Sequence, residues 1–255
     1  MNKVLEINDL GFSYHTLSGE TRAIENVSFD VYENEFIGII GPSGSGKSTI
    51  LSLIFGLLTP TFGQIHTANL PHHPGDTAIG YMLQKDHLFE WRSIYKNITL
   101  GLEINHQHTR EKKEFIEKML QDYDLEAFKE ARPSQLSGGM RQRAALIRTL
   151  ALKPSLLLLD EPFSALDSQT RLAVAEDIYK ILRKERKSAV LVTHDISEAI
   201  SFCDRVVVLS RRPGKVKHIV PIRLTVSEKT PLKARSAPEF RDYFNMLWEE
   251  LHDES

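Results

Sequence analysis

A glycine-rich segment at residues 41–49, with the sequence GPSGSGKST, constrains the fold of this chain more than any other stretch. An apolar run at 36–40 leads into it and another at 50–54 follows, an order that predicts a strand, a loop and a helix. Glycines let consecutive backbone N–H groups curve around a phosphate, and the start of the helix adds a partial positive charge. The segment therefore predicts a phosphate-binding loop, or P-loop, rather than a merely flexible turn.

Two side chains at the end of this loop suit a nucleotide. Lys47 can reach the β- and γ-phosphates, and the Ser48 hydroxyl can take one ligand position of Mg²⁺. The loop residues that we expect to bind the nucleotide are Gly41, Ser43, Gly44, Gly46, Lys47, Ser48 and Thr49.

Length and composition allow one large domain, or a core with an inserted subdomain. The chain has 255 residues, of which 41% are hydrophobic, so it can bury a sizeable core. A net charge of −2 does not favour a nucleic-acid partner, and no apolar run reaches the roughly 18 residues of a membrane span. Residues 1–7 lack the apolar stretch of a signal peptide, so we expect a cytoplasmic protein.

Cysteine and histidine residues give no evidence of a metal centre. Cys203 is the only cysteine, which excludes an intrachain disulfide and a cysteine-cluster zinc site and favours a small buried residue. Two histidine pairs, 72–73 and 106/108, lie in a turn and a polar segment without carboxylates at ligand spacing.

Residues 4–7 and 27–31 have strand patterns and predict a small β-layer before the P-loop strand. Tyr14 could stack on an adenine base, although packing within the β-layer explains it equally well. A further strand at 77–83 ends at Gln84, whose amide could face the nucleotide or simply be exposed.

From about residue 86 to 152 the sequence predicts helices inserted between strands. Within this part, Ser137, Gly138 and Gly139 precede a helix and form a second N-terminus suited to an anion. An ordinary helix cap is the alternative. Because the P-loop already binds one nucleotide's phosphates, this second site could serve the nucleotide of another chain.

Four consecutive leucines at 156–159 predict a strand buried on both faces in a parallel sheet, and two carboxylates follow it. Neighbouring residues of a strand point in opposite directions, so Asp160 can hold Mg²⁺ through water while Glu161 orients or deprotonates an attacking water. A simple capping role is the alternative for both.

Strand patterns recur at 189–193 and 205–209. The first ends at His194, on the edge of the sheet where open α/β folds bind ligands, and an RRPG turn at 211–214 follows the second. The sequence SAPE at 236–239 predicts the start of a C-terminal helix. Its apolar stripe is expected to dock on the core or a partner and comprises Phe240, Tyr243, Phe244, Leu247, Trp248 and Leu251.

Taken in order, these segments resemble the nucleotide-binding subunit of ATP-binding cassette (ABC) transporters over residues 3–220. Residues 41–49 resemble the Walker A motif, 136–140 the signature and 156–161 the Walker B motif. By the same resemblance Gln84 is the Q-loop glutamine, Asp167 the D-loop aspartate, His194 the switch histidine and Tyr14 the adenine-stacking aromatic residue.

The resemblance implies an α/β fold: a P-loop NTPase core with a mainly parallel sheet, an N-terminal antiparallel β-layer and an inserted helical subdomain. The implied ATPase domain spans 1–222, with a RecA-like core at 1–84 and 151–222 and a helical subdomain at 85–150. Residues 223–255 would form a C-terminal helical extension.

The resemblance also implies a head-to-tail homodimer that closes on two ATP molecules. Glu161 would activate water, His194 and Gln84 would contact the γ-phosphate, water or Mg²⁺, and the metal ligands would be Ser48, Gln84 and Asp160. Ser137, Gly138 and Gly139 would complete the partner's site. Closure would drive membrane permease subunits through the groove near Gln84, and a solute-binding protein outside the membrane would take part indirectly.

Met140 at the end of the signature and the RRPG turn are similar to the importer branch for nitrate, sulfonate, taurine and pyrimidine-type solutes. Trp91 stands where a proline is common in the family. A soluble ABC ATPase of DNA repair or translation is the alternative, but such proteins carry long coiled coils or two cassettes. Here only about 90 residues separate Lys47 from Ser137. An ATP-binding regulator without turnover would lack Glu161 or His194, and both are present.

Overall fold

The computed structural model describes residues 2–16, 19–67 and 79–252. Its strands are β1 (Lys3–Thr16), β2 (Gly19–Tyr32), β3 (Phe36–Ile40), β4 (Phe62–His66), β5 (Ile79–Met82), β6 (Leu156–Asp160), β7 (Ser188–Val192), β8 (Arg205–Leu209) and β9 (Val216–Pro221). Its α-helices are α1 (Lys47–Ile54), α2 (Ile94–Ile98), α3 (Leu100–Ile104), α4 (Arg110–Asp122), α5 (Gly138–Leu150), α6 (Ser168–Lys184), α7 (Ile196–Phe202), α8 (Pro231–Ala234) and α9 (Phe240–His252). Two short 3₁₀ turns, η1 (Glu126–Phe128) and η2 (Pro133–Gln135), precede α5.

The larger sheet brings the ends of three strands to one place. Its order is β5-β6-β7-β3-β8-β9, with every pair parallel except β8 and β9. In the register, Val192 lies opposite both Asp160 of β6 and Ile39 of β3. Because β6, β7 and β3 are neighbours and parallel, the segments that follow them emerge side by side at the same edge.

The four-leucine run of β6 is buried on both faces, as its sequence predicts. All four side chains are fully buried. Leu156 and Leu158 belong to one apolar cluster, and Leu157 and Leu159 to another on the opposite face. The alternation follows from the two-residue period of a strand.

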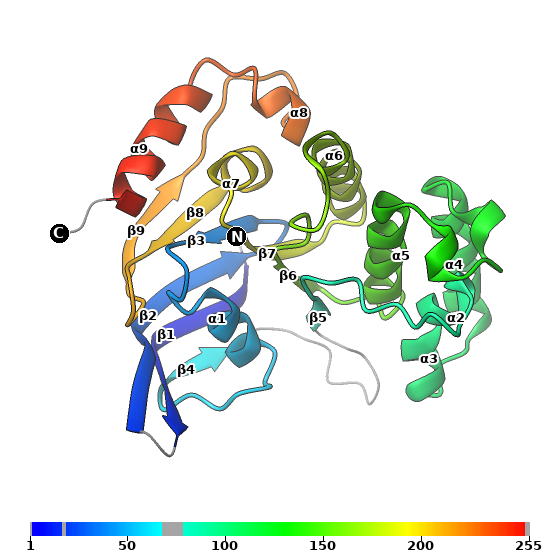
Figure 1. The fold of residues 1–255 in the computed structure, drawn as a ribbon, viewed down its shortest axis with the longest axis horizontal. Helices are drawn as coiled ribbons and strands as arrows, with labels where there is room; N and C mark the ends of the chain where they lie inside the picture. Colours follow the sequence, from blue (N-terminus) through cyan, green and yellow to red (C-terminus); the bar gives the residue numbers. More distant parts are fainter. Residues whose placement is uncertain (1, 17–18, 68–78, 253–255) are drawn as a thin grey trace.

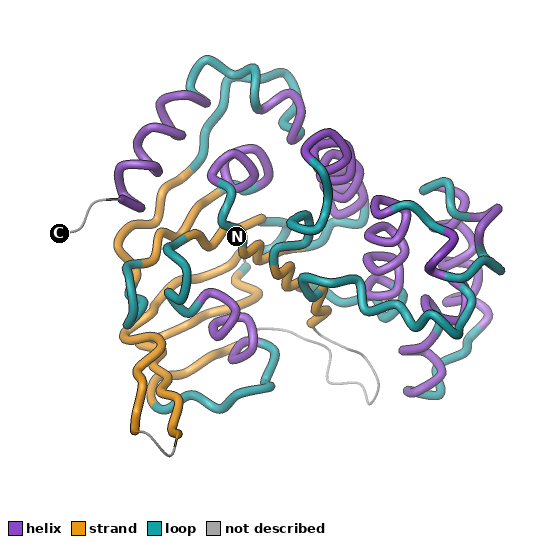
Figure 2. Tube along the Cα trace, in the orientation of Figure 1, coloured by secondary structure: helices purple, strands orange, loops and turns teal. Residues whose placement is uncertain are grey.

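One face of the large sheet packs against α1 and the smaller antiparallel sheet, which has the order β2-β1-β4. The apolar layer between them includes Leu5 and Ile7 of β1, Ile37 of β3 and Ile50 of α1. Figures 1 and 2 show α1 beside these strands. The layer holds α1, and with it the loop at 41–46, against the sheet.

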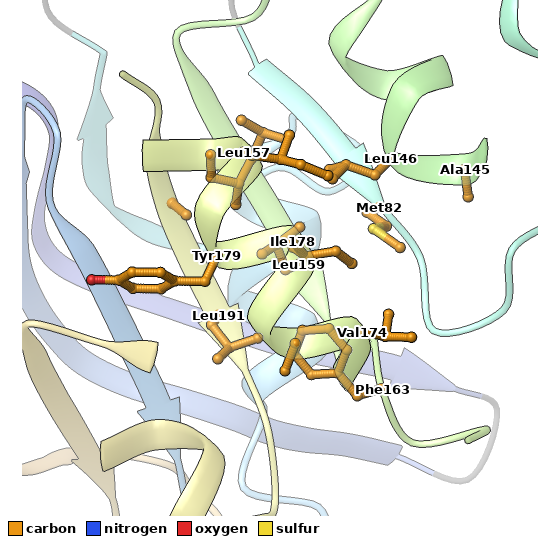
Figure 3. Packing of buried hydrophobic residues seen from close by; sticks show 14 of the residues in the cluster. Met82, Ala145, Leu146, Leu157, Leu159, Phe163, Val174, Ile178, Tyr179 and Leu191 are labelled. Carbon is orange, nitrogen blue, oxygen red and sulfur yellow. The ribbon is translucent and has the colours of Figure 1, made fainter. Parts of the chain in front are cut away.

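Helices cover the other face. Figure 3 shows Leu157 and Leu159 packed among side chains of the flanking helices, including Leu146 of α5 and Ile178 of α6. The same cluster continues to Ile116 of α4, so the helical lobe of α2 to α5 seen beyond β5 in Figure 1 shares the apolar core of the sheet.

The structure confirms the predicted fold class and adds elements that the sequence patterns missed. The strand β9 and the short helices α7 and α8 were not expected, and α9 begins at Phe240 rather than at Ser236. The stripe of α9 packs on the core, with Leu247 fully buried, but Trp248 is an exception to the prediction because it is 50% exposed. Cys203 is buried as expected, and burial raises the pKa of its thiol.

Candidate active site

A cavity of about 620 Å³ lies at the edge where β3, β6 and β7 end. It brings together nine of the residues predicted to bind or hydrolyse a nucleotide: Tyr14, Ser43, Gly44, Gly46, Lys47, Ser48, Thr49, Glu161 and His194. Ala23 and Arg212 complete the lining. Residues separated by more than 150 positions thus share one cavity.

The P-loop geometry depends on a glycine at position 46. Gly46 is the N-cap of α1 and has a φ of 92°, in the left-handed region that side chains disfavour. A Cβ atom at this position would lie 2.4 Å from Cγ2 of Ile24 on β2. The close approach of the loop to β2 therefore requires glycine here.

Lys47 is held by the loop itself. Its side chain is only 8% exposed, and Nζ donates hydrogen bonds to the carbonyl oxygens of Gly41 at 2.8 Å and Pro42 at 3.0 Å. Burial lowers the pKa of Lys47, while the charges of Glu161 and Asp160 act in the opposite direction. These bonds use two of the three N–H donors of the ammonium group, so one donor is left for a phosphate.

Asp160 and Ser48 form an oxygen-rich corner beside the cavity. The Ser48 hydroxyl donates to Oδ1 of Asp160 at 3.1 Å, and the Tyr81 hydroxyl donates to Oδ2 at 3.3 Å. Burial raises the pKa of Asp160, partly offset by these two hydrogen bonds, and burial also raises the pKa of Tyr81, to about 12. A hydroxyl and a carboxylate are the hard oxygen donors that Mg²⁺ takes, so these residues fit the metal.

Glu161 is the meeting point of the predicted catalytic side chains. Its Oε2 lies 3.2 Å from Nδ1 of His194 and accepts a hydrogen bond of 3.2 Å from Nε2 of Gln84. Glu161 itself has a φ of 44°, an uncommon value for a residue with a side chain. The amide of Glu161 donates to the carbonyl oxygen of Val192, and the carbonyl oxygen of Glu161 accepts from the amide of Ser164. These two hydrogen bonds fix the backbone at Glu161.

Tyr14 lies within β1, packs against a neighbouring aromatic ring and also borders the cavity. Its ring and that of Phe12 form a T-shaped pair with centroids 4.9 Å apart, and its hydroxyl lies 3.1 Å from Oγ1 of Thr49. The residue is 42% exposed and lines the cavity. Packing in the β-layer therefore leaves part of Tyr14 accessible from the cavity.

The structure leaves the signature residues outside the cavity lining. Ser137 caps α5 by accepting a hydrogen bond from the amide of Met140 at 3.4 Å, and both Ser137 and Gly138 are exposed. Asp167 likewise caps α6, accepting from the amides of Gln169 and Thr170. The capping alternative is thus realised for Ser137, and the cap at Asp167 was not expected; the exposed Ser137 and Gly138 remain open to a second molecule.

Sequence patterns missed Arg212 as a cavity residue, because the RRPG segment was interpreted only as a turn. The two consecutive arginines beside a predicted ligand edge were the signal that could have identified it.

The histidines at 72 and 73 and the turn predicted at 71–75 lie outside the described residues. Among the residues that the structure describes, no group of three or more His, Cys, Asp or Glu side chains is arranged to hold a metal ion. Nor does any helix within the same ranges have the length and apolar character needed to cross a membrane.

Comparisons with known proteins identify the family of this chain. The ABC transporter family profile matches residues 24–164, which include the P-loop, Glu161 and Ser137. The ABC transporter ATP-binding protein YtlC of Bacillus subtilis is 42% identical over 248 residues, covering 97% of this chain and 95% of the relative. The nitrate import ATP-binding protein NrtD of Synechocystis is 38% identical over 243 residues, covering 94% and 91%.

A solved structure of the ATP-binding cassette MJ0796, a dimer in a post-hydrolysis state bound to ADP and Pi, superposes with a TM-score of 0.69. It is 31% identical and covers 86% of this chain and 99% of its own. The family match and the relatives confirm the resemblance read from the motifs. The chain belongs to the ABC transporter family.

Proposed function

We propose that this chain is the ATP-hydrolysing subunit of an ABC importer. The observation that carries the proposal is the single cavity in which the P-loop lysine, the Ser48 hydroxyl, Glu161 and His194 converge. A phosphate-binding loop alone would support only nucleotide binding, whereas a carboxylate and an imidazole on the same cavity supply groups for hydrolysis.

In the proposed reaction, Lys47 leaves the carbonyls of Gly41 and Pro42 and binds the β- and γ-phosphates. Ser48 and Asp160 would hold Mg²⁺, which would neutralise developing charge on the phosphates. Glu161 orients the attacking water and accepts its proton. His194 fixes the Glu161 carboxylate through the 3.2 Å contact and faces the γ-phosphate, while Gln84 holds the same oxygen from the other side.

Tyr14 packs a face of its ring against the adenine base. The loop amides from Gly41 to Thr49, with Ser43 and Gly44 at the cavity mouth, cradle the phosphates. This assignment uses all the cavity residues that the sequence predicted.

The active unit is proposed to be a head-to-tail homodimer. Ser137, Gly138 and Gly139 lie at the N-terminus of α5, outside the lining of this chain's own nucleotide cavity. Ser137 and Gly138 are exposed. Such an N-terminus attracts anions. A second copy would therefore place these residues on the nucleotide of the first, and Asp167 would lie at the junction.

The helical part at 85–150 and the RecA-like parts at 1–84 and 151–222 are proposed as the moving units, with 223–255 as an extension. Gln84 stands at the junction between them, which suits a role in passing motion to permease subunits. The partners proposed are those permeases, with an extracytoplasmic solute-binding protein acting indirectly and no nucleic acid. The site of action is then the cytoplasmic face of the membrane.

Nitrate, sulfonate, taurine or a pyrimidine-type solute is the proposed class of cargo, supported by similarity to the nitrate import protein NrtD. The named relatives are transporter proteins, which does not favour the alternative of a soluble DNA-repair or translation ATPase.

Phosphate release from ATP by the purified chain tests the proposal. Lys47→Ala should abolish binding of ATP, because it removes the ammonium group that faces the cavity. Lys113→Ala, an exposed lysine of α4, is the matched control and should leave both binding and turnover unchanged. Normal ATP affinity in Lys47→Ala would refute the assignment of the cavity to ATP.

A further inference from the structure

The loop that joins β8 to β9 reaches the nucleotide cavity with an arginine. Arg212 lines the cavity with Lys47, Ser48 and Thr49, whereas its neighbour Arg211 is not part of the lining. None of the roles assigned above uses Arg212.

This loop is closed by hydrogen bonds of its own. The amide of Ser210 donates to the carbonyl oxygen of Lys215 at 2.9 Å, and the amide of Lys215 donates to the Ser210 hydroxyl at 2.9 Å. The same hydroxyl donates to the carbonyl oxygen of Pro213 at 3.2 Å. The tip that carries Arg212 is therefore a defined turn.

Gly214 fixes this loop against β2 and beside the P-loop. The amide of Gly214 donates to the carbonyl oxygen of Ala23 on β2 at 2.9 Å, and the carbonyl of Gly214 accepts from the amide of Glu25 on β2 at 3.0 Å. A Cβ atom on Gly214 would lie only 2.0 Å from the carbonyl oxygen of Ser45, so the two loops touch backbone to backbone. This contact sets the distance between Arg212 and the phosphate-binding segment.

Among the described residues, the guanidinium of Arg212 forms a hydrogen bond through Nε rather than through its terminal nitrogens. Nε donates to the carbonyl oxygen of Gly44 at 3.2 Å. Within the described part of the chain, no carboxylate forms an ion pair with Arg212, and the side chain is exposed at the cavity rim. A guanidinium has five donors in a planar fork that matches phosphate oxygens.

The charges around the cavity favour a second cation. Lys47 is the other lysine or arginine of the lining, while Glu161 lines the cavity and Asp160 adjoins it through Ser48. These two carboxylates oppose the approach of a polyphosphate, which itself carries several negative charges. Mg²⁺ at Ser48 and Asp160 would offset part of this charge when bound, and Arg212, held by Gly44, adds a positive charge that is present without the metal.

We propose that Arg212 binds the phosphate chain of the nucleoside triphosphate as a second cationic ligand, keeping Nε on Gly44 while its terminal nitrogens bind phosphate oxygens. The inference rests on the proposed function, because it concerns the same cavity. It assigns a binding residue to a loop that is remote in sequence from the P-loop.

The test measures the Kd of Mg²⁺ and a non-hydrolysable ATP analogue by calorimetry, at low and high potassium chloride, with the full chain. Arg212→Gln keeps a donor for Gly44 but removes the charge, and should weaken binding about tenfold at low salt, since the charge-assisted hydrogen bonds to phosphate are lost. The loss should shrink at high salt because the contact is screened. Arg212→Lys should retain most of the affinity, and the control Arg211→Gln should bind within about twofold of the parent chain.

Wild-type affinity in Arg212→Gln, a loss of equal size at both salt concentrations, or an equal loss in Arg212→Lys would overturn the inference. Each would mean that Arg212 only supports the Gly44 backbone or does not act on the ligand. Lys47→Ala separates this result from the fate of the proposed function: if it abolishes binding while Arg212→Gln binds as tightly as the parent chain, the ATP site stands and only the role of Arg212 falls.

Discussion

His194 Nδ1 lies 3.2 Å from Glu161 Oε2, although the two residues follow different strands. The contact exists because β6 and β7 are adjacent and parallel, so that the residues after Asp160 and Val192 emerge together. Glu161 is 23% exposed at its side chain and His194 61%, which leaves the pair open to a ligand from the cavity side.

Replacing Glu161 by glutamine should stop turnover but keep the nucleotide. The amide has nearly the same shape and removes the proton acceptor, so the rate of phosphate release should fall by about 10²- to 10⁴-fold, while the Kd for ATP stays within a few-fold. Glu114→Gln, an exposed residue of α4, is the control and should hydrolyse ATP normally. Near-normal turnover in Glu161→Gln would remove Glu161 from the mechanism.

Ser137→Arg should separate nucleotide binding from assembly. Ser137 lies outside the cavity lining, so the Kd for ATP should be unchanged, but the bulky cation should block a second chain from closing on this surface. In light scattering with ATP, the Glu161→Gln variant should form dimers. The double variant with Glu161→Gln and Ser137→Arg should remain a monomer under the same conditions. Ser134→Arg, three residues upstream and also exposed, is the control. Full ATPase activity in Ser137→Arg would argue against a site shared between chains.

Asp160→Asn should stabilise the nucleotide-free chain and inactivate it. Burial raises the folded-state pKa of Asp160, so its ionised form opposes folding, and stability is lost as the pH rises through that pKa. Asparagine has no carboxylate to ionise, so this loss of stability does not occur. Its amide can still accept a hydrogen bond from one of the Ser48 and Tyr81 hydroxyls and donate one to the other. The melting temperature of the variant should exceed that of the parent at neutral pH, and the difference should shrink on acidification.

Without the Asp160 carboxylate, Mg²⁺-dependent hydrolysis should fall at least about 100-fold. Asp242→Asn, on an exposed position of α9, should change neither stability nor activity. An unchanged melting temperature together with full activity in Asp160→Asn would contradict both roles of the carboxylate.

Leu158→Ala should destabilise the fold through a cavity in the layer between the two sheets. Leu158 is fully buried there, and truncations of this kind cost about 2–5 kcal/mol in the free energy of unfolding. For a chain of this size the melting temperature should fall by several degrees, at about 2–4 °C per kcal/mol. Leu232→Ala is the matched control, because that leucine is 57% exposed and should cost less than about 0.5 kcal/mol.

Continuous apolar runs made the central strands predictable. The segments 36–40 and 205–209 are bounded in the structure as the sequence indicated, and the strand predicted at 156–159 extends by one residue to Asp160, because strands buried on both faces need no polar alternation. The site was predictable for a related reason: β3, β6 and β7, once parallel, fix the edge at which Lys47, Glu161 and His194 must meet.

Elements at the margins were harder to predict because their patterns are mixed. β9 has only half-buried and exposed positions and carries Lys217 and His218, so it gave no apolar signal. α7 has only seven residues, although its Asp195 cap, which accepts from the amides of Ser197 and Glu198, left a recognisable signature. Trp248 was wrongly predicted to dock with the rest of the α9 stripe, because helical spacing cannot show where the core surface under the helix ends.

The hydrogen bonds from Lys47 to the carbonyls of Gly41 and Pro42 use two of the three N–H donors of its ammonium group. One donor is left for a first phosphate oxygen, and each further oxygen has to replace a neutral carbonyl. A charged phosphate oxygen is a stronger acceptor than a carbonyl, so a ligand with several such oxygens can favour the exchange. The P-loop thus positions its lysine before the nucleotide arrives.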